Sequence, residues 1–382
     1  MARTWHDVPL TGGPVEFRGA LDARRTEHGV LPLRLPGWTR AQYPDAFVRG
    51  VAEMPAGVRL AFATRARTLE LEVHTTVWRF EGEPDAVPPG VFEVYADGEP
   101  AGRTAVPACT VWWLTGPRAS PRVVPGPAAT VRFTLPPGTE QVELWLPQQT
   151  PTELVALRAD AEVTAPAPDG RRRWVHHGSS ISHCLGADGP TGTWPAVAAL
   201  RGGVDGVNLS LAGNAMLDPF VARVIRDAPA DLISLKAGIN IVGRAAFRLR
   251  TFGPAVHGFL DTVREGHSDT PLLVISPVTA PALEETPGPA GADGDGMLTA
   301  LGDPADVAEG ALTLGVVREE LARIVAERRA HDPRLHYLDG RELFGPADVA
   351  DLPDGLHPNA AATRRMGERF AVLAFGPDGI FG

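Results

Sequence analysis

The sequence has 382 residues, of which 44% are hydrophobic and 21% are charged, and its net charge at pH 7 is −10. That length suits two domains better than one core, and the apolar fraction is ordinary for a globular protein. Because a negative field repels phosphate backbones, nucleic acid is not an expected partner. The first residues lack the apolar run of a signal peptide, and no stretch approaches the roughly 20 apolar residues of a membrane span. We therefore expect no membrane association and a cytoplasmic location.

The composition also bears on cofactors. The two cysteines, Cys109 and Cys184, fall in different predicted domains and indicate no disulfide framework. The histidines lack the spacing of metal ligands, and the glycines form neither a dinucleotide-binding motif nor a phosphate loop. We expect no metal and no cofactor, and nothing in the sequence specifies an oligomeric state.

Residues 1–163 have the pattern of an all-β domain. Apolar and polar residues alternate in short runs that Gly- and Pro-rich turns separate: 58–62, 69–73, 91–96, 131–135 and 142–146. This pattern predicts an antiparallel β-sandwich without helices. Trp112 and Trp113 are adjacent on a predicted strand, so they face opposite ways and cannot both enter one core. We take both as candidate substrate contacts.

A Pro-rich linker, residues 164–172, precedes a second domain at 173–382 in which strands and helices alternate. This order predicts an α/β fold, a parallel sheet with helices on both faces, and ligands then bind at the carboxyl ends of the strands. Residues 277 to about 310 interrupt the alternation and are rich in Gly, Ala, Pro and Asp; they are either disordered or a lid. The expected strands are 174–177, 207–210, 232–235, 272–276 and 335–338, and the expected helices are 194–200, 217–226, 255–264, 316–329 and 359–373.

Four short polar blocks follow predicted strands or precede the last helix. They are Gly178-Ser179-Ser180, Leu211-Ala212-Gly213-Asn214, Gly238-Ile239-Asn240 and Asp354-Gly355-Leu356-His357. Gly178 is expected to take backbone angles that a side chain forbids, which would expose the following serine on a sharp turn near a helix start. A serine hydroxyl is a poor nucleophile until a base takes its proton, and Asp-x-x-His delivers a base with its orienting carboxylate on one turn.

In this order the blocks resemble those of the SGNH, or GDSL-type, hydrolase family, over about residues 172–375. The resemblance implies a three-layer, flavodoxin-like fold for this domain. It also implies that Ser180 is the nucleophile, His357 the base and Asp354 its orienting group. The oxyanion hole would consist of the backbone N–H groups of Ser180 and Gly213 and the side-chain amide of Asn240.

The chain departs from the family pattern at two positions. Ser179 stands where the family has aspartate, and Ile241 follows Asn240 where many members have aspartate. Ser179, His183 and Asn214 lie close to the blocks and are further candidates for substrate binding. His176 and His177, on the strand before the nucleophile, are expected to be one buried and one edge residue.

Two-domain relatives in this family carry an N-terminal sandwich similar to carbohydrate-binding modules, and some are acyltransferases that act on polyketide scaffolds such as tetracyclines. The resemblance implies acyl transfer through an acyl-serine, with an ester or acyl-CoA as donor. The acceptor stays open between a hydroxyl on a bulky natural product and water, as in a carbohydrate or small-ester esterase. A third reading, a sugar-binding protein without activity, is disfavoured because all five residues of the expected site are present.

Overall fold

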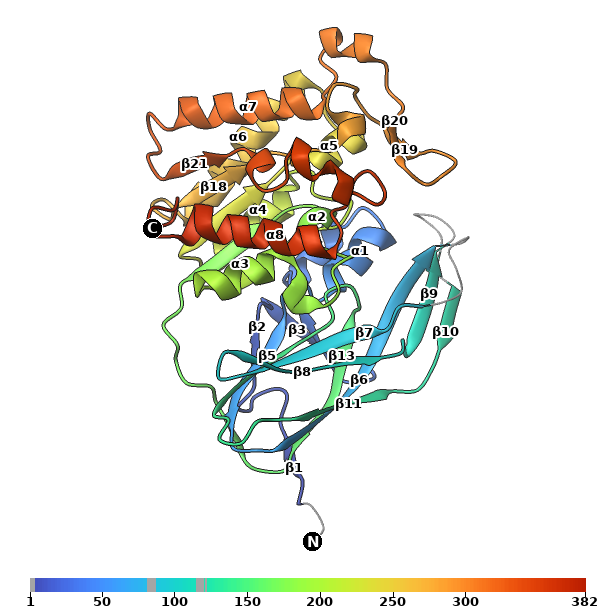
Figure 1. Cartoon of the computed structure of the whole chain (residues 1–382), viewed down its shortest axis with the longest axis vertical. Helices are drawn as coiled ribbons and strands as arrows, with labels where there is room; N and C mark the ends of the chain where they lie inside the picture. Colours follow the sequence, from blue (N-terminus) through green and yellow to red (C-terminus); the bar gives the residue numbers. More distant parts are fainter. Residues whose placement is uncertain (1–3, 81–86, 115–119, 121) are drawn as a thin grey trace. The chain divides into compact units, whose positions relative to one another are not determined.

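The computed structural model describes residues 4–80, 87–114, 120 and 122–382. The chain divides into two compact units (Figure 1). The first, which we call the sandwich unit, comprises Met1–Gly170 together with Asp188–Thr191. The second, the α/β unit, comprises Arg171–Ala187 and Gly192–Gly382.

The sandwich unit contains two β-sheets. Its strands are β1 (His6–Val8), β2 (Glu16–Arg18), β3 (Asp22–Arg25), β4 (Val30–Leu33), β5 (Arg59–Thr64), β6 (Thr68–Phe80), β7 (Gly90–Ala96), β8 (Glu99–Val106), β9 (Thr110–Leu114), β10 (Arg122–Pro125), β11 (Ala129–Thr134), β12 (Gln141–Trp145), β13 (Thr152–Ala159) and β14 (Val163–Thr164). One sheet has the order β10-β9-β6-β13-β4-β3, with β1 on β13 and β11 on β6; the other has the order β14-β5-β12-β7-β8, with β2 on β5. Alternate side chains from both sheets, such as Leu60, Leu71 and Phe92, share one core. The pairing is antiparallel apart from β6 with β9, which run parallel.

The sandwich unit also contains a helix, α1 (Ala46–Glu53), so the prediction of a helix-free N-terminal domain was wrong. The Asp45 carboxylate caps this helix by accepting the N–H of Val48 at 2.9 Å. The helix is close against the sheet, because a Cβ on Gly50 would lie 2.7 Å from the Trp78 ring. The buried residues Val48, Val51 and Ala52 have helical spacing. Three such positions are too few to identify a helix in a sequence that otherwise alternates as strands do.

The α/β unit is built on a five-stranded sheet whose neighbouring strands are all parallel. Its elements are β15 (Arg173–His177), α2 (Ser180–His183), α3 (Trp194–Gly202), β16 (Asp205–Asn208), α4 (Pro219–Asp227), β17 (Leu232–Lys236), α5 (Ile239–Gly243), α6 (Leu249–Gly266), β18 (Leu272–Ile275), η3 (Pro281–Leu283), β19 (Ala290–Ala292), β20 (Leu298–Ala300), η4 (Pro304–Glu309), α7 (Leu314–Arg328), β21 (Leu335–Leu338), η5 (Gly340–Glu342), η6 (Pro346–Asp351), α8 (Ala360–Phe370) and η7 (Ala371–Phe375). The strand order β16-β15-β17-β18-β21 places the second strand first, which is the flavodoxin-like order. The predicted fold class is confirmed.

Helices cover both faces of this sheet (Figure 1). Trp174 of β15 stacks on Phe370 of α8 and lies 6.1 Å from the ring of Trp194 of α3. His177, three residues later, stacks on Phe259 of α6. Neighbouring residues on a strand point to opposite faces, so α3 and α8 cover one face and α6 lies on the other. His176 and His177 are both 1% exposed on this central strand, so the expectation of one edge histidine was wrong.

Several element boundaries differ from the prediction, and the largest difference is at α6, which begins at Leu249 and not at 255. α4 begins at Pro219 and not at 217, because Leu217 has a left-handed backbone (φ 59°) and proline is favoured in the first turn of a helix. The stretch 277–310 contains η3, β19, β20 and η4, so it is not the disordered segment that one reading expected.

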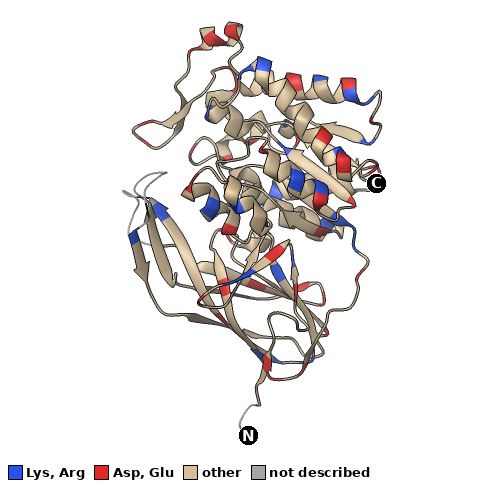
Figure 2. Cartoon of the chain, turned by 180° about the vertical axis from the view of Figure 1, so that it is seen from behind, with Lys and Arg blue, Asp and Glu red and all other residues tan. Residues whose placement is uncertain are grey.

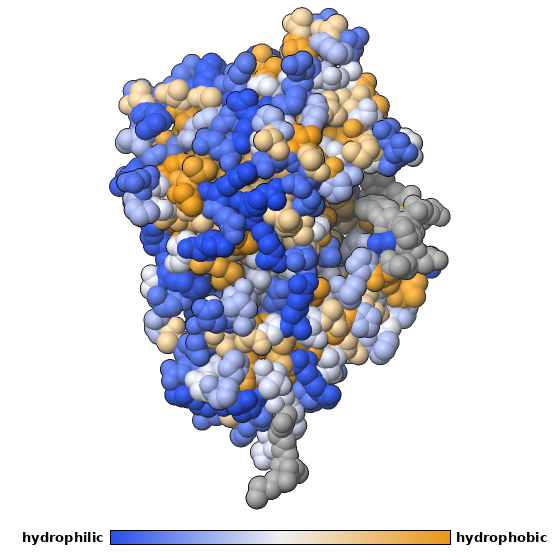
Figure 3. Space-filling view, in the orientation of Figure 1, coloured by the Kyte–Doolittle hydropathy of each residue, from blue (hydrophilic) through white to orange (hydrophobic). Residues whose placement is uncertain are grey.

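The surface has neither one sign of charge nor one hydropathy on the faces that the figures show. Acidic and basic residues are interspersed along the helices of the α/β unit (Figure 2), and hydrophobic residues are scattered among hydrophilic ones (Figure 3). None of the helices in the described part of the chain combines the length and the apolar character that crossing a bilayer requires.

Candidate active site

The nucleophile turn joins β15 to the four-residue helix α2, whose first residue is Ser180. The Ser179 hydroxyl caps this helix by accepting the N–H of Ile181 at 3.3 Å. Gly178 does not adopt left-handed angles, so that expectation was wrong. It is a glycine because a Cβ there would lie 2.4 Å from Ser182 Oγ.

Ser180, His357 and Asp354 form a continuous hydrogen-bonded chain. Ser180 Oγ lies 2.8 Å from His357 Nε2, and His357 Nδ1 lies 2.6 Å from Asp354 Oδ2. The other Asp354 oxygen accepts the backbone N–H groups of Leu356 at 2.9 Å and His357 at 2.7 Å. An ionised carboxylate only accepts hydrogen bonds, so it holds the proton on Nδ1 and leaves Nε2 free to accept the serine proton.

The electrostatics of the turn favour that arrangement. Partial burial raises the pKa of Asp354, but the hydrogen bonds from the His357 ring and from the backbone of His357 and Leu356 outweigh it and hold the pKa well below its usual range. Asp354 is therefore ionised at neutral pH. The His357 and Asp354 side chains are 41% and 43% exposed, whereas Ser180 is 8% exposed. The histidine is thus open to small molecules.

The two blocks expected to form the oxyanion hole flank the same turn. Leu211 donates its N–H to the carbonyl of Gly178 at 2.9 Å, which places Gly213 just beyond the nucleophile turn. Asn240, on α5, accepts the N–H of Ala215 at 3.1 Å through its side-chain oxygen. This leaves the amide NH₂ of Asn240 as a donor. One backbone hydrogen bond thus joins the first two blocks, the Asn240 side chain joins the third block to the residue after the second, and the Ser180–His357 bond joins the last.

The additional candidates from the sequence take less exposed positions. Ser179 is 1% exposed and His183, at the end of α2, is fully buried. Asn214 is half-buried, and its side chain donates to the carbonyl of Ala212 in its own loop at 2.7 Å.

Trp112 and Trp113 lie on β9 of the sandwich unit, and each is half-buried. The Trp112 ring packs against Trp78 with their centroids 4.7 Å apart, and the Arg122 guanidinium lies 5.3 Å from the Trp113 ring centroid. Both rings thus keep exposed surface while making contacts within their own sheet.

Asn208 is a site residue that the sequence analysis did not single out. It ends β16 and is 4% exposed; its side chain donates to the carbonyl of Ser182 at 3.0 Å and accepts the N–H of Ser210 at 3.0 Å. Asn208 therefore supports α2 from the neighbouring strand. Its signal in the sequence was an amide at the carboxyl end of a strand just before the second block.

Lys236, the only lysine of the chain, is buried at the end of β17. Its pKa is lowered to about 8, mainly by burial; Cys184 opposes this shift and the charge of Arg318 adds to it. Burial also raises the pKa of the Cys184 thiol to about 12. Among the described residues, no three His, Cys, Asp or Glu side chains are grouped as metal ligands would be.

A serine hydroxyl bonded to a histidine, which is bonded to a carboxylate, at the carboxyl edge of a parallel sheet defines a serine-dependent acyl-transfer enzyme. Residues 177–365 match the model of the GDSL-like lipase/acylhydrolase family. The α/β unit thus carries a GDSL-like domain, which confirms the resemblance seen in the sequence, and the protein is a serine esterase or acyltransferase.

Several solved structures resemble the chain. The salicylyl-acyltransferase SsfX3 from a tetracycline biosynthetic pathway is 28% identical with a TM-score of 0.78, and the match covers 97% of this chain and 96% of that one. A putative GDSL-like lipase from Bacteroides ovatus is 18% identical with a TM-score of 0.67, over 96% of both chains. A family two carbohydrate esterase from Clostridium thermocellum is 13% identical with a TM-score of 0.55, over 83% of this chain and 91% of that one. The last two share the fold. No curated protein matches the chain.

Proposed function

We propose that the protein moves an acyl group from a small ester or thioester, such as an acyl-CoA, to a hydroxyl of a bulky natural-product acceptor, through an acyl-enzyme on Ser180. The observation that carries this proposal is the chain of hydrogen bonds from Ser180 Oγ through His357 to Asp354, at 2.8 and 2.6 Å. An acyl-CoA donor would be met in the cytoplasm, which is the location we propose.

The reaction has two halves. Ser180 Oγ attacks the donor carbonyl while His357 Nε2 takes its proton; the tetrahedral intermediate then expels the leaving thiol or alcohol, which receives that proton. In the second half the acceptor hydroxyl gives its proton to His357 and attacks the acyl carbon, and Ser180 leaves with the proton. Asp354 stabilises the imidazolium in both halves.

The negative charge that develops on the carbonyl oxygen needs fixed donors. We assign this role to the backbone N–H groups of Ser180 and Gly213 and to the side-chain amide of Asn240. The Asn240 oxygen is already occupied by Ala215 N–H, so the amide is held with its donor side free. Loss of one such donor costs about 3 kcal/mol of transition-state stabilisation.

One observation favours transfer to an alcohol, and another favours hydrolysis. The likeness to a salicylyl-acyltransferase extends over 97% of this chain and therefore over both of its units, which favours transfer. The half-exposed His357 ring leaves room for water, which favours hydrolysis as the second candidate.

The test is to load the enzyme with 4-nitrophenyl acetate or acetyl-CoA and to offer it a series of alcohols. We expect new ester to exceed free acid when a bulky alcohol is present, and we expect Ser180→Ala to form neither. If free acid were the sole product at every alcohol concentration, transfer would fail and the hydrolase would stand.

A further inference from the structure

The insertion between β18 and α7 carries a small hairpin, β19 (Ala290–Ala292) and β20 (Leu298–Ala300), at the side of the α/β unit opposite the C-terminus (Figure 1). Most residues from 291 to 297 are exposed. An isolated two-stranded hairpin is marginally stable in water, so the contacts that hold this one in place are informative.

The insertion contacts the helix that carries Asn240, and the hairpin itself contacts the 354–357 block. At its base, a Cβ on Gly288 would lie 1.9 Å from the carbonyl oxygen of Val242, in the helix that carries Asn240. On its second strand, Leu298 donates its N–H to the carbonyl of Asp354 at 2.8 Å. A Cβ on Gly355 would lie 3.3 Å from Leu298 Cβ and 3.5 Å from Met297 Cε. Met297 and Leu298 are therefore packed against the turn that presents His357.

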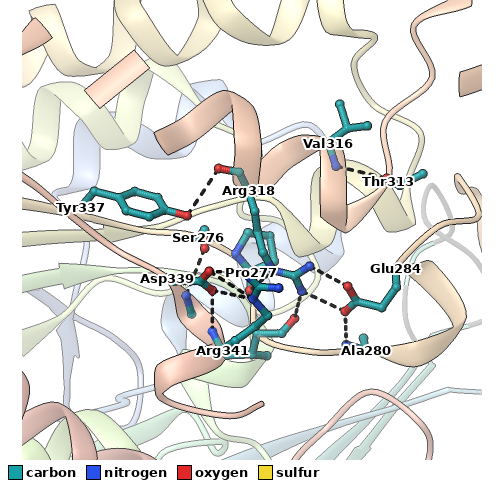
Figure 4. Close-up of polar contacts among 12 residues, drawn as sticks. Ser276, Pro277, Ala280, Glu284, Thr313, Val316, Arg318, Tyr337, Asp339 and Arg341 are labelled. Carbon is teal, nitrogen blue, oxygen red and sulfur yellow. Dashed lines mark hydrogen bonds and ion pairs between the residues drawn. The ribbon is translucent and has the colours of Figure 1, made fainter. Parts of the chain in front are cut away.

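The entrance to the insertion is fixed by an ion pair (Figure 4). Arg318 of α7 donates to both oxygens of Glu284, at 2.6 and 2.8 Å, and to the carbonyls of Pro277 and Val278, at 3.0 and 3.1 Å. The Arg318 side chain is 6% exposed and that of Glu284 27%, so the arginine is buried and its partner is partly exposed. The hairpin thus has a defined position beside His357.

The hairpin presents apolar side chains to solvent at the start of β20, beside the 354–357 turn. Met297 is 37% exposed, and Leu298 is half-buried. The charges of the hairpin are confined to its turn, which appears red in Figure 2, where Asp293 accepts the N–H groups of Asp295 and Met297. Exposed apolar side chains beside a reactive group are typical of a substrate contact.

We propose that Met297 and Leu298 form an apolar wall of the subsite for the acceptor alcohol and select acceptors with a hydrocarbon body next to the reacting hydroxyl. This role rests on the proposed function, because there the acceptor alcohol gives its proton to His357 Nε2. The oxygen of the alcohol must lie within hydrogen-bond reach of that nitrogen, and the rest of the alcohol must extend over the surface around the 354–357 turn. The hairpin borders that turn, so the side chains of Met297 and Leu298 contact the alcohol.

The test uses the partition of one acyl-enzyme. The full-length protein is acetylated with 4-nitrophenyl acetate, and benzyl alcohol or methanol competes with water for the acetyl group. The readout is the ratio of benzyl acetate to methyl acetate formed at equal alcohol concentration. A substitution that disturbs His357 or Asp354 slows the formation of both esters to the same extent, so its effect cancels in this ratio. The variants are Met297→Ser and Leu298→Ser, and the matched control is Val372→Ser, an apolar side chain of η7 that is 72% exposed.

We expect the wild type to favour benzyl alcohol. Each hairpin variant should lower the ratio about tenfold, because the phenyl ring loses its contact with one apolar side chain. Val372→Ser should leave the ratio unchanged. An unchanged ratio in both hairpin variants overturns this inference alone. If the wild type released nitrophenol no faster than Ser180→Ala does, the proposed function itself would fall, and the inference with it.

Discussion

At the scale of single residues, the nucleophile turn presents two adjacent serines that the structure distinguishes. Ser180 contacts His357, whereas the Ser179 hydroxyl caps α2. Ser180→Ala should therefore abolish acyl-enzyme formation without unfolding the chain. Ser179→Ala should keep substantial activity and lose about 1 kcal/mol of stability as a lost helix cap. Initial rates and thermal unfolding of both variants provide the check; a dead Ser179→Ala beside an active Ser180→Ala would show that the nucleophile is assigned to the wrong serine.

Asp354 offers a second residue-scale prediction. Asp354→Asn should lower kcat by about 10⁴-fold while the fold persists, because the amide can present an N–H to His357 and stabilise the wrong tautomer. The wild-type carboxyl has a pKa below its usual range, so its stabilising effect is present above pH ~4 and is lost only as the pH falls through the folded value. Loss of activity on mild acidification should therefore not arise from protonation of Asp354. A near-normal rate for the variant would mean that another group orients His357.

Lys236 gives a prediction about stability. Burial lowers its pKa to about 8, whereas the unfolded chain keeps the proton to about pH 10.4. Between these values the unfolded state binds more protons, so the contribution of Lys236 to stability rises with pH. Lys236→Met should raise the unfolding free energy by about 1–3 kcal/mol at pH 7 and by much less at pH 10. The check is thermal or urea unfolding of both proteins at the two pH values; an equal difference at both would show that the lysine is not buried as an ammonium.

The sequence predicted a serine, a histidine and an aspartate because nucleophile, base and orienting acid must be of particular types, and the structure joins these three side chains by hydrogen bonds. It did not predict the residues that support them. Asn208 acts through a carbonyl on a neighbouring element, and Met297 and Leu298 act through the placement of a hairpin. Such roles depend on which loops meet, and residue type alone does not specify that.

At the scale of elements, the pair between the buried Arg318 and the partly exposed Glu284 anchors the insertion. Glu284→Ala would leave the Arg318 charge buried without its carboxylate and should cost about 2–4 kcal/mol. We expect protease cleavage within 285–310 to become faster as well. The control is Glu368→Ala, which removes a pair with Arg201 whose side chains are 61% and 46% exposed and should cost less than about 0.5 kcal/mol. Equal losses in the two variants would contradict the anchoring role.

The buried strands of the parallel sheet were predicted well, whereas elements that contacts with distant residues hold in place were not. Strands β15, β17, β18 and β21 begin and end within one residue of their predicted limits, because buried strands of a parallel sheet are short apolar runs. Helix α1 and hairpin β19–β20 were missed. Each is short, and each is held by contacts from elsewhere in the chain, Trp78 for the helix and Asp354 for the hairpin.

At the scale of the whole molecule, the two units are not two consecutive stretches of chain. The sandwich unit includes Asp188–Thr191, which stands in the sequence between α2 and α3. Glu93 of β7, 8% exposed, accepts the N–H of Thr191 at 3.0 Å and its hydroxyl at 2.5 Å. A Cβ on Gly189 would lie 2.5 Å from the same carboxylate, and Arg103 donates to the carbonyl of Asp188. No pattern along the sequence could reveal a four-residue segment that belongs to a distant strand.

This segment leads to the last prediction. Glu93→Ala should leave the N–H and hydroxyl of Thr191 without an acceptor in a buried place, which costs about 1–3 kcal/mol. Glu93→Gln keeps an acceptor oxygen and should lose less, so it serves as the matched control. Hydrogen exchange on the full-length chain should then show faster exchange at the amides of Thr191 and its neighbours in Glu93→Ala than in Glu93→Gln. Equal exchange and equal melting temperatures in the two variants and the wild type would mean that Asp188–Thr191 keeps its place without the carboxylate.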